Sequence, residues 1–243
     1  MARPPTFDVE LVRSEPLSHR VKSLRFRRVD GEPIVFDAGQ WISLALPLET
    51  GEVRRAYSIA SEPAGSSEFD LAVTLVDNGP GSPFLHALPV GSHLTAIGPQ
   101  GFFTRTRELG QPALFIATGT GVTPLRSMIL DAARRGEKTP QWLLFGLRTE
   151  RDIIYRAELE ELARTHSWFR FLPTLSQGTD DWAGLRGYVQ THVAHLWKEL
   201  EAEGKAAPHT FICGLHEMVG SVRDLLRKEM QVPREFVHSE RYD

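Results

Sequence analysis

A glycine-rich loop over Thr118–Pro124 is the part of the sequence best suited to bind a ligand through its backbone. An apolar run at Phe115–Ala117 leads into the loop, and a helical pattern over 124–135 follows it. Glycines let a ligand approach the main chain closely, and the start of a helix offers free N–H groups to an anion. The spacing differs from G-x-G-x-x-G, and a Gly-x-Gly turn by itself could be purely structural. Its place between a strand and a helix is nevertheless where doubly wound sheets bind phosphates. Its candidate ligand residues are Thr118, Gly119, Thr120, Gly121, Thr123 and Pro124.

A second group of candidate ligands lies earlier in the chain, in two short motifs. An arginine can neutralise a phosphate, a tyrosine ring can stack on a flat ring, and a serine can hydrogen-bond a ring heteroatom. Ser82 as the N-cap of a short helix would present an anion site. Each residue also has a plain structural interpretation, with Arg55 on a solvated strand face and Tyr57 in the core. The residues of this group are Arg55, Ala56, Tyr57, Ser58, Gly79, Gly81 and Ser82.

The first hundred residues must position this second group. They contain short apolar or alternating segments separated by turn residues, which predicts a six-stranded antiparallel β-barrel with one short helix. The expected strands are Phe7–Val12, Val21–Arg27, Trp41–Leu46, Arg55–Ile59, Phe69–Val76 and His93–Ile97, and the expected helix is Ser82–Leu88.

The rest of the chain alternates apolar runs with helical patterns, which predicts an α/β domain with a parallel sheet covered by helices on both faces. We expect the boundary between the two domains near Thr104–Pro112, where charged residues, a glycine and a proline interrupt both patterns. The expected strands are Ala113–Ala117, Trp142–Phe145, Phe169–Leu175 and Phe211–Cys213, and the expected helices are 124–135, 156–165, 188–201 and 216–230.

The motifs together resemble those of the ferredoxin–NADP reductase superfamily, and the resemblance covers nearly the whole chain. The matching motifs are Arg55–Ser58, Gly79–Ser82, Gly119–Pro124, Cys213-Gly214 and the late aromatic Tyr242. The resemblance implies an FAD-binding β-barrel domain over residues 1–104 and an NAD(P)-binding α/β domain over residues 105–243.

The resemblance also implies roles for the residues of the barrel. Arg55 would bind the flavin phosphate, Tyr57 would stack on the isoalloxazine, and Ser58 would lie near its N5. The backbone N–H groups of Gly81 and Ser82 would hold the pyrophosphate of FAD.

In the second domain, the resemblance assigns the pyrophosphate of the nicotinamide nucleotide to Gly119–Thr123 and the nicotinamide to Cys213-Gly214. Glu240 would assist nicotinamide placement or proton movement, and Tyr242 would cover the flavin ring. Cys213 could equally be a small buried hydrophobic residue, and Glu240 an exposed charge near the chain end.

An activity follows from the resemblance. Hydride would pass between NAD(P)H and FAD, and the flavin would exchange single electrons with a ferredoxin or flavodoxin. The alternatives are an NADH-dependent reductase component of an oxygenase, an NAD(P)H:flavin reductase, or a flavin-binding sensor without turnover.

The choice of nucleotide and of electron carrier stays open in the sequence. Arg148 or Ser176 could bind the 2′-phosphate of NADPH, and we favour NADPH slightly over NADH. The basic strand Arg25–Arg28, together with Arg20 and Lys22, could attract an acidic carrier or could be a solvated strand edge.

The composition of the chain argues against several classes of protein. A net charge of −3 gives no sign of a nucleic-acid partner, and the single cysteine excludes an intramolecular disulfide and an iron–sulfur cluster with about four cysteine ligands. No signal-peptide core and no run of about 18 apolar residues occurs, so we expect a soluble, cytoplasmic protein without membrane contact, and a monomer. We expect no metal, because no ligand spacing links His86, His93, His166, His192, His195, His209, His216 and His238.

Overall fold

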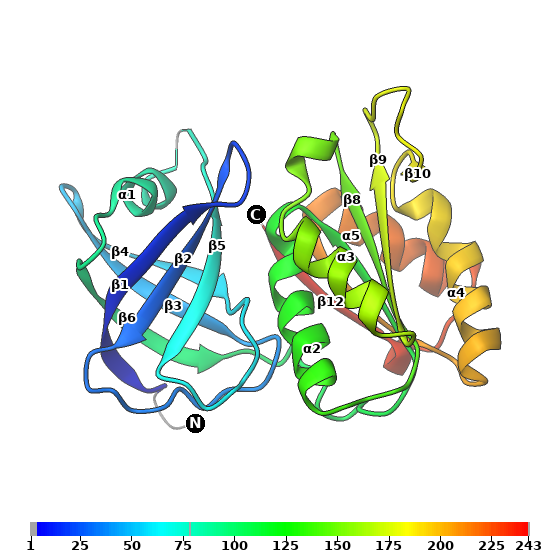
Figure 1. The fold of residues 1–243 in the computed structure, drawn as a ribbon, viewed down its shortest axis with the longest axis horizontal. Coiled ribbons are helices and arrows are strands. Elements are labelled where there is room, and N and C mark those ends of the chain that lie inside the picture. The colour runs from blue at the N-terminus through cyan, green and yellow to red at the C-terminus, as the bar shows by residue number, and fades with distance from the viewer. Residues whose placement is uncertain (1–3, 78, 243) are drawn as a thin grey trace. The chain divides into compact units, whose positions relative to one another are not determined.

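The chain divides into two units, each built on its own sheet (Figure 1). The structure is a computed structural model and describes residues 4–77 and 79–242. One unit comprises residues 1–106 with 126–132, and the other comprises residues 107–125 with 133–243. The predicted combination of an antiparallel β-unit with a parallel α/β unit is confirmed.

The first unit is a curled six-stranded antiparallel sheet in the order β4-β3-β6-β1-β2-β5. An antiparallel bridge between Ile59, directly after β4, and Leu71 of β5 links the two outermost strands and brings the sheet towards a closed barrel. Phe26 and Phe69 stack inside it with their ring centroids 5.8 Å apart. The strands are β1 (Thr6–Pro16), β2 (Val21–Arg28), β3 (Trp41–Leu48), β4 (Gly51–Ser58), β5 (Glu68–Thr74) and β6 (His93–Gln100), and the short helix is α1 (Gly81–Ala87).

The basic strand β2 lies inside the sheet, which corrects its interpretation as a strand edge. It lies between β1 and β5, and carboxylates lie within salt-bridge distance of its arginines. Arg25 binds both oxygens of Asp70, at 2.7 and 2.8 Å. The other pairs on the strand are Arg27 with Glu10 and Arg28 with Asp30, and Arg20, directly before β2, pairs with Asp77.

The second unit is a six-stranded parallel sheet in the order β10-β9-β8-β7-β11-β12. The short β10 and the C-terminal β12 were not among the expected strands. The strands are β7 (Ala113–Thr118), β8 (Gln141–Leu147), β9 (Phe169–Leu175), β10 (Leu185–Arg186), β11 (His209–Leu215) and β12 (Val237–Tyr242).

Helices lie on both faces of this parallel sheet. Figure 1 shows α3 in front of the sheet and α5 behind it. Val193 and Leu200 of α4 and Val219 of α5 share a buried cluster with Leu114 and Ile212 of the sheet. The helices are α2 (Val122–Arg134), α3 (Arg156–Thr165), α4 (Gln190–Gly204) and α5 (His216–Asp224), and a π-helical turn continues α5 over Leu225–Glu229.

Among the residues that the structure describes, no helix has both the length and the apolar character needed to cross a bilayer.

The Arg25–Asp70 pair generates a stability prediction. Arg25→Gln should lower the free energy of unfolding by about 1–3 kcal/mol, because Asp70 is 7% exposed and would lose a charged, bidentate partner. The matched variant Arg27→Gln breaks a more exposed pair and should cost less than about 1 kcal/mol. Urea unfolding followed by circular dichroism measures both values, and equal losses in the two variants would contradict the assignment.

Candidate cofactor and nucleotide sites

The glycine-rich loop lies where the strand order of the parallel sheet reverses. The chain begins this sheet at β7, adds β8, β9 and β10 on one side, and then returns to place β11 and β12 on the other. The loops after β7 and β11 therefore leave neighbouring carboxyl ends in different directions. A reversal of this kind forms the ligand-binding crevice of doubly wound sheets.

Two glycines allow these two loops to touch. A Cβ on Gly121 would overlap the backbone carbonyl of Cys213, and a Cβ on Gly214 would overlap the Oγ1 atom of Thr118. The N–H of Leu215 donates a hydrogen bond to that Thr118 hydroxyl over 3.2 Å. The motifs Thr118–Gly121 and Cys213-Gly214, distant in the sequence, thus form one packed unit.

Gly119 has a different role from Gly121. It adopts a left-handed backbone with φ of 53°, and a Cβ placed there would meet no atom within 4 Å. The backbone at Gly119 is exposed, whereas Gly121 is buried against β11. Our sequence interpretation placed ligand phosphates along both glycines. Of these two, only Gly119 has open space at the position of a Cβ.

The C-terminal strand β12 brings two predicted site residues, Glu240 and Tyr242, close to the glycine-rich loop after β7 and to β11. β12 pairs in parallel with β11, which sets Glu240 opposite Cys213 and Tyr242 opposite Leu215. The hydroxyl of Thr123 donates to the carbonyl of Thr120 over 2.7 Å and lies 3.1 Å from the hydroxyl of Tyr242.

Cys213 is held as a neutral thiol. Burial, followed by the negative charge of Glu240, raises the pKa of the Cys213 thiol well above its usual value, and a hydrogen bond with Tyr242 only partly opposes this shift. A raised thiol pKa means that the reactive thiolate is scarce at neutral pH. Cys213 therefore suits a packing or contact role better than a nucleophilic one.

Arg148 and Ser176 lie just beyond the carboxyl ends of β8 and β9. The N–H of Ser176 donates to the carbonyl of Leu147 over 3.0 Å, and the N–H of Gln177 donates to the carbonyl of Arg148 over 2.8 Å. These backbone bonds hold the two candidate residues on adjacent turns at the carboxyl edge of the sheet. The side chain of Arg148 is exposed there.

In the barrel, β4 and the start of α1 bring the candidate flavin ligands together. A Cβ on Gly81 would lie 3.0 Å from Cγ of Arg55, so the missing side chain lets the stem of Arg55 pack against the helix start. Arg55 and Ala56 are exposed at the surface, while Ser58 is 4% exposed.

Tyr57 packs on the barrel core, as its plain interpretation expected. It lies against the buried cluster of the barrel, and burial raises the pKa of its hydroxyl to about 12. The hydroxyl is therefore neutral at physiological pH. A partly buried, neutral ring still offers a rigid surface to a flat ligand.

Ser82 is not an N-cap, which corrects our expectation. The N-cap of α1 is Pro80, and Ser82 is the second residue of the helix. Its hydroxyl accepts a hydrogen bond from the N–H of Val76 over 2.9 Å and faces the carbonyl of the same residue. The side chain therefore closes the turn before α1, which leaves the backbone N–H groups of Gly81 and Ser82 as the candidate anion ligands.

Comparison with protein families identifies both units. Residues 8–104 match the family model of the oxidoreductase FAD-binding domain, and residues 115–224 match that of the oxidoreductase NAD-binding domain. The protein is thus an oxidoreductase that uses FAD and a nicotinamide nucleotide.

Individual relatives narrow the class. The chain is 56% identical over 238 residues to ferredoxin–NADP reductase B of Sorangium cellulosum strain So ce56, covering 98% of each chain. It is 36% identical to the reductase component of phenol 2-monooxygenase from Pseudomonas sp. strain CF600, covering 84% of this chain and 56% of that one. A ferredoxin NADP+ reductase structure from Neisseria gonorrhoeae, with bound FAD and NADP, shares the fold with a TM-score of 0.81, 20% identity and 99% coverage of both chains. The chain belongs to the ferredoxin–NADP reductase family.

The loop contact generates a prediction for nucleotide binding. Gly121→Ala should raise the Michaelis constant for NADPH by about 10- to 100-fold, because the new Cβ must push the loop away from β11 by a distance on the order of 1 Å. Flavin content should not change. The matched variant Gly220→Ala adds a Cβ that meets nothing within 4 Å on α5 and should behave like wild type. Steady-state kinetics with varied NADPH measures the Michaelis constant of each variant. An unchanged value in Gly121→Ala would show that the contact between the two loops does not determine nucleotide binding.

Proposed function

We propose that the protein transfers electrons between NADPH and a ferredoxin or flavodoxin, with FAD bound by residues 1–104 and the nucleotide bound by residues 105–243. The observation that carries this proposal is the 56% identity to a ferredoxin–NADP reductase over 98% of both chains. When bound, FAD accepts hydride from a nicotinamide and can release the electrons singly.

The barrel residues would bind and orient the flavin. The guanidinium of Arg55 and the N–H groups of Gly81 and Ser82 supply positive charge and donors to its phosphates. The close contact between Arg55 and Gly81 supports this assignment, because it gathers these groups in one place. Tyr57 would carry the isoalloxazine on its ring, and Ser58 would lie near N5.

The residues of the parallel unit would bind and orient the nucleotide. Thr118, Gly119, Thr120, Gly121 and Thr123, with the start of α2 at Val122 and Pro124, would hold its pyrophosphate. Cys213 and Gly214 would form the wall beside the nicotinamide. Tyr242 would cover the flavin ring, and Glu240 would position the nicotinamide or move a proton.

The preference for NADPH is supported by the exposed Arg148 at the carboxyl end of β8, with Ser176 on the adjacent turn. A guanidinium can bind a 2′-phosphate, which NADH lacks. The same choice agrees with the name of the 56% identical relative, a ferredoxin–NADP reductase.

A second function, as the reductase component of an oxygenase, has its own support. The chain is 36% identical to the reductase component of phenol 2-monooxygenase, although it spans only 56% of that protein. In either function we propose a cytoplasmic monomer. The paired arginines of β2 lend no support to a carrier site on that strand.

The two functions differ in their electron donor and acceptor. The purified protein should be yellow, and anaerobic NADPH should bleach its flavin band more efficiently than NADH does. Oxidised ferredoxin or flavodoxin should then restore the band, and ferredoxin should support NADPH-dependent reduction of cytochrome c. A strong preference for NADH without turnover of either carrier would favour the oxygenase component, and a yellow protein that neither nucleotide bleaches would refute both functions.

Arg55 offers a test of the flavin site alone. Arg55→Ala should weaken FAD binding by about ten- to a hundredfold, since a charge-assisted contact contributes roughly 1.5–3 kcal/mol. Arg54→Ala is the matched control, because Arg54 neighbours Arg55 on β4 and forms an exposed pair with Glu52 at 3.3 Å. Flavin released by dialysis and re-titrated by fluorescence gives both dissociation constants. Equal constants for the two variants would remove Arg55 from the site.

A further inference from the structure

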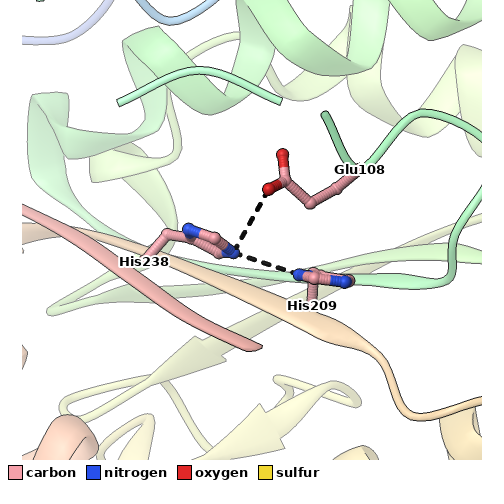
Figure 2. Close-up of side chains that lie close together, drawn as sticks. All are labelled: Glu108, His209 and His238. Carbon is pink, nitrogen blue, oxygen red and sulfur yellow. Dashed lines mark hydrogen bonds and ion pairs between the residues drawn. The ribbon is translucent and has the colours of Figure 1, made fainter. Parts of the chain in front are cut away.

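Two histidines and a glutamate converge at the amino end of the β11–β12 pair. Figure 2 shows the Glu108 carboxylate directed at His238, whose ring nitrogen also faces His209. The Nδ1 atom of His209 lies 3.1 Å from Nε2 of His238, which lies 4.0 Å from Oε1 of Glu108. One ligand atom from each of the three residues lies within 4.8 Å of both others.

The fold places these residues together although the sequence separates them. His209 begins β11, and its N–H donates to the carbonyl of Pro112 over 2.9 Å, which ties the segment before β7 to this end of the sheet. A turn closed by the N–H of Gln111 and the carbonyl of Glu108 folds that segment back. His238 lies on β12 opposite Phe211. Spacing along the chain therefore gave no sign of the cluster.

Aromatic contacts hold both imidazole rings in place. The ring of His238 stacks on Phe211, with centroids 4.5 Å apart and planes 14° apart. The ring of His209 lies 4.7 Å from that of Phe236. Ligands whose orientation is fixed by packing lose little freedom when they bind an ion.

The geometry and the donor chemistry match a small divalent ion. Imidazole nitrogens and a carboxylate oxygen are ligands of Zn²⁺, and tetrahedral bonds of about 2.0–2.1 Å place neighbouring ligand atoms roughly 3.3 Å apart. The two nitrogens are close to that separation, at 3.1 Å. The Glu108 oxygen lies 4.0 Å from Nε2 of His238 and would approach that nitrogen by about 0.7 Å. An ion between the two facing nitrogens needs a lone pair on each, so any proton between them would move to the other nitrogen of its ring.

We propose that Glu108, His209 and His238 bind one divalent transition-metal ion, with Zn²⁺ as the best match and solvent as the remaining ligand. The side chains of His238 and Glu108 are 25% and 14% exposed, so the ion can enter from solvent. His209 and Cys213 lie four positions apart on β11, or roughly 13 Å at strand rise, so the site is separate from the nicotinamide end of the strand.

The site would join three segments of the second unit. Glu108 belongs to the segment before β7, and the histidines belong to the last two strands of the sheet in chain order. An ion bound by all three would fasten this segment to β11 and β12. We therefore expect Zn²⁺ to raise the melting temperature of the holoenzyme.

The test is Zn²⁺ binding to the tag-free, EDTA-treated holoenzyme, measured by equilibrium dialysis with elemental analysis and by isothermal titration calorimetry. Wild type should bind one equivalent, and Glu108→Gln and His238→Phe should each bind at least about tenfold more weakly. Phenylalanine keeps the stack on Phe211, so this variant removes the ligand without removing the packing. His195→Ala is the control, because the side chain of His195 is 82% exposed and its carboxylate neighbour Glu199, at 3.5 Å, lies on the same helix.

Each result of the Zn²⁺-binding test either supports the proposed site or overturns it. Loss of Zn²⁺ binding and of the thermal shift in Glu108→Gln and His238→Phe, with both kept in His195→Ala, supports the site. Equal binding by wild type and both site variants would place the ion elsewhere and overturn the proposal. Failure of wild type to bind Zn²⁺ would also overturn it, whereas flavin reduction by NADPH would be unaffected by either result.

Discussion

The contact between the loop after β7 and the loop after β11 is the constraint on which the nucleotide end of this protein depends. Gly121 lies against the Cys213 carbonyl, and Gly214 lies against the Thr118 hydroxyl, so neither position has room for a side chain. The reversal of strand order explains why these loops are neighbours at all. Both of these glycines serve packing, whereas Gly119 of the same loop is exposed and has open space where a side chain would be.

The barrel uses its charges differently from what its sequence suggests. A strand with several arginines looks like a surface for an acidic partner, yet β2 pairs on both sides, and its neighbours supply carboxylates to Arg25 and Arg27. Paired charges in a sheet contribute to register and local stability, whereas steering of a carrier requires an unbalanced potential. The stem of the exposed Arg55 packs instead against the start of α1, where we propose that a phosphate binds.

The pattern of apolar residues along the sequence predicted most of the fold. The features that it did not predict depend on contacts between segments that are far apart in the sequence. Apolar alternation identified the six barrel strands, and apolar runs identified the central strands of the parallel sheet. The sequence did not predict β12, because its residues VHSERY are mostly polar. Such a strand gains its stability from pairing with β11. Ser82 was misplaced because a serine before an apolar run looks like an N-cap, while its true partner, Val76, lies across a turn. The cluster of Glu108, His209 and His238 depends on three segments meeting, which spacing along the chain does not reveal.

The register in which β12 pairs with β11 determines the position of functional side chains at both ends of β12. Side chains on alternate residues of a strand share a face, so His238, Glu240 and Tyr242 project together. Pairing sets these three opposite Phe211, Cys213 and Leu215 in turn. A slip of one residue would turn all three to the other face at once. The turn before β12, closed by the N–H of Phe236 and the carbonyl of Pro233, fixes where the strand begins. This short polar strand therefore positions both the residues proposed to act near the nicotinamide and the histidine proposed to bind an ion.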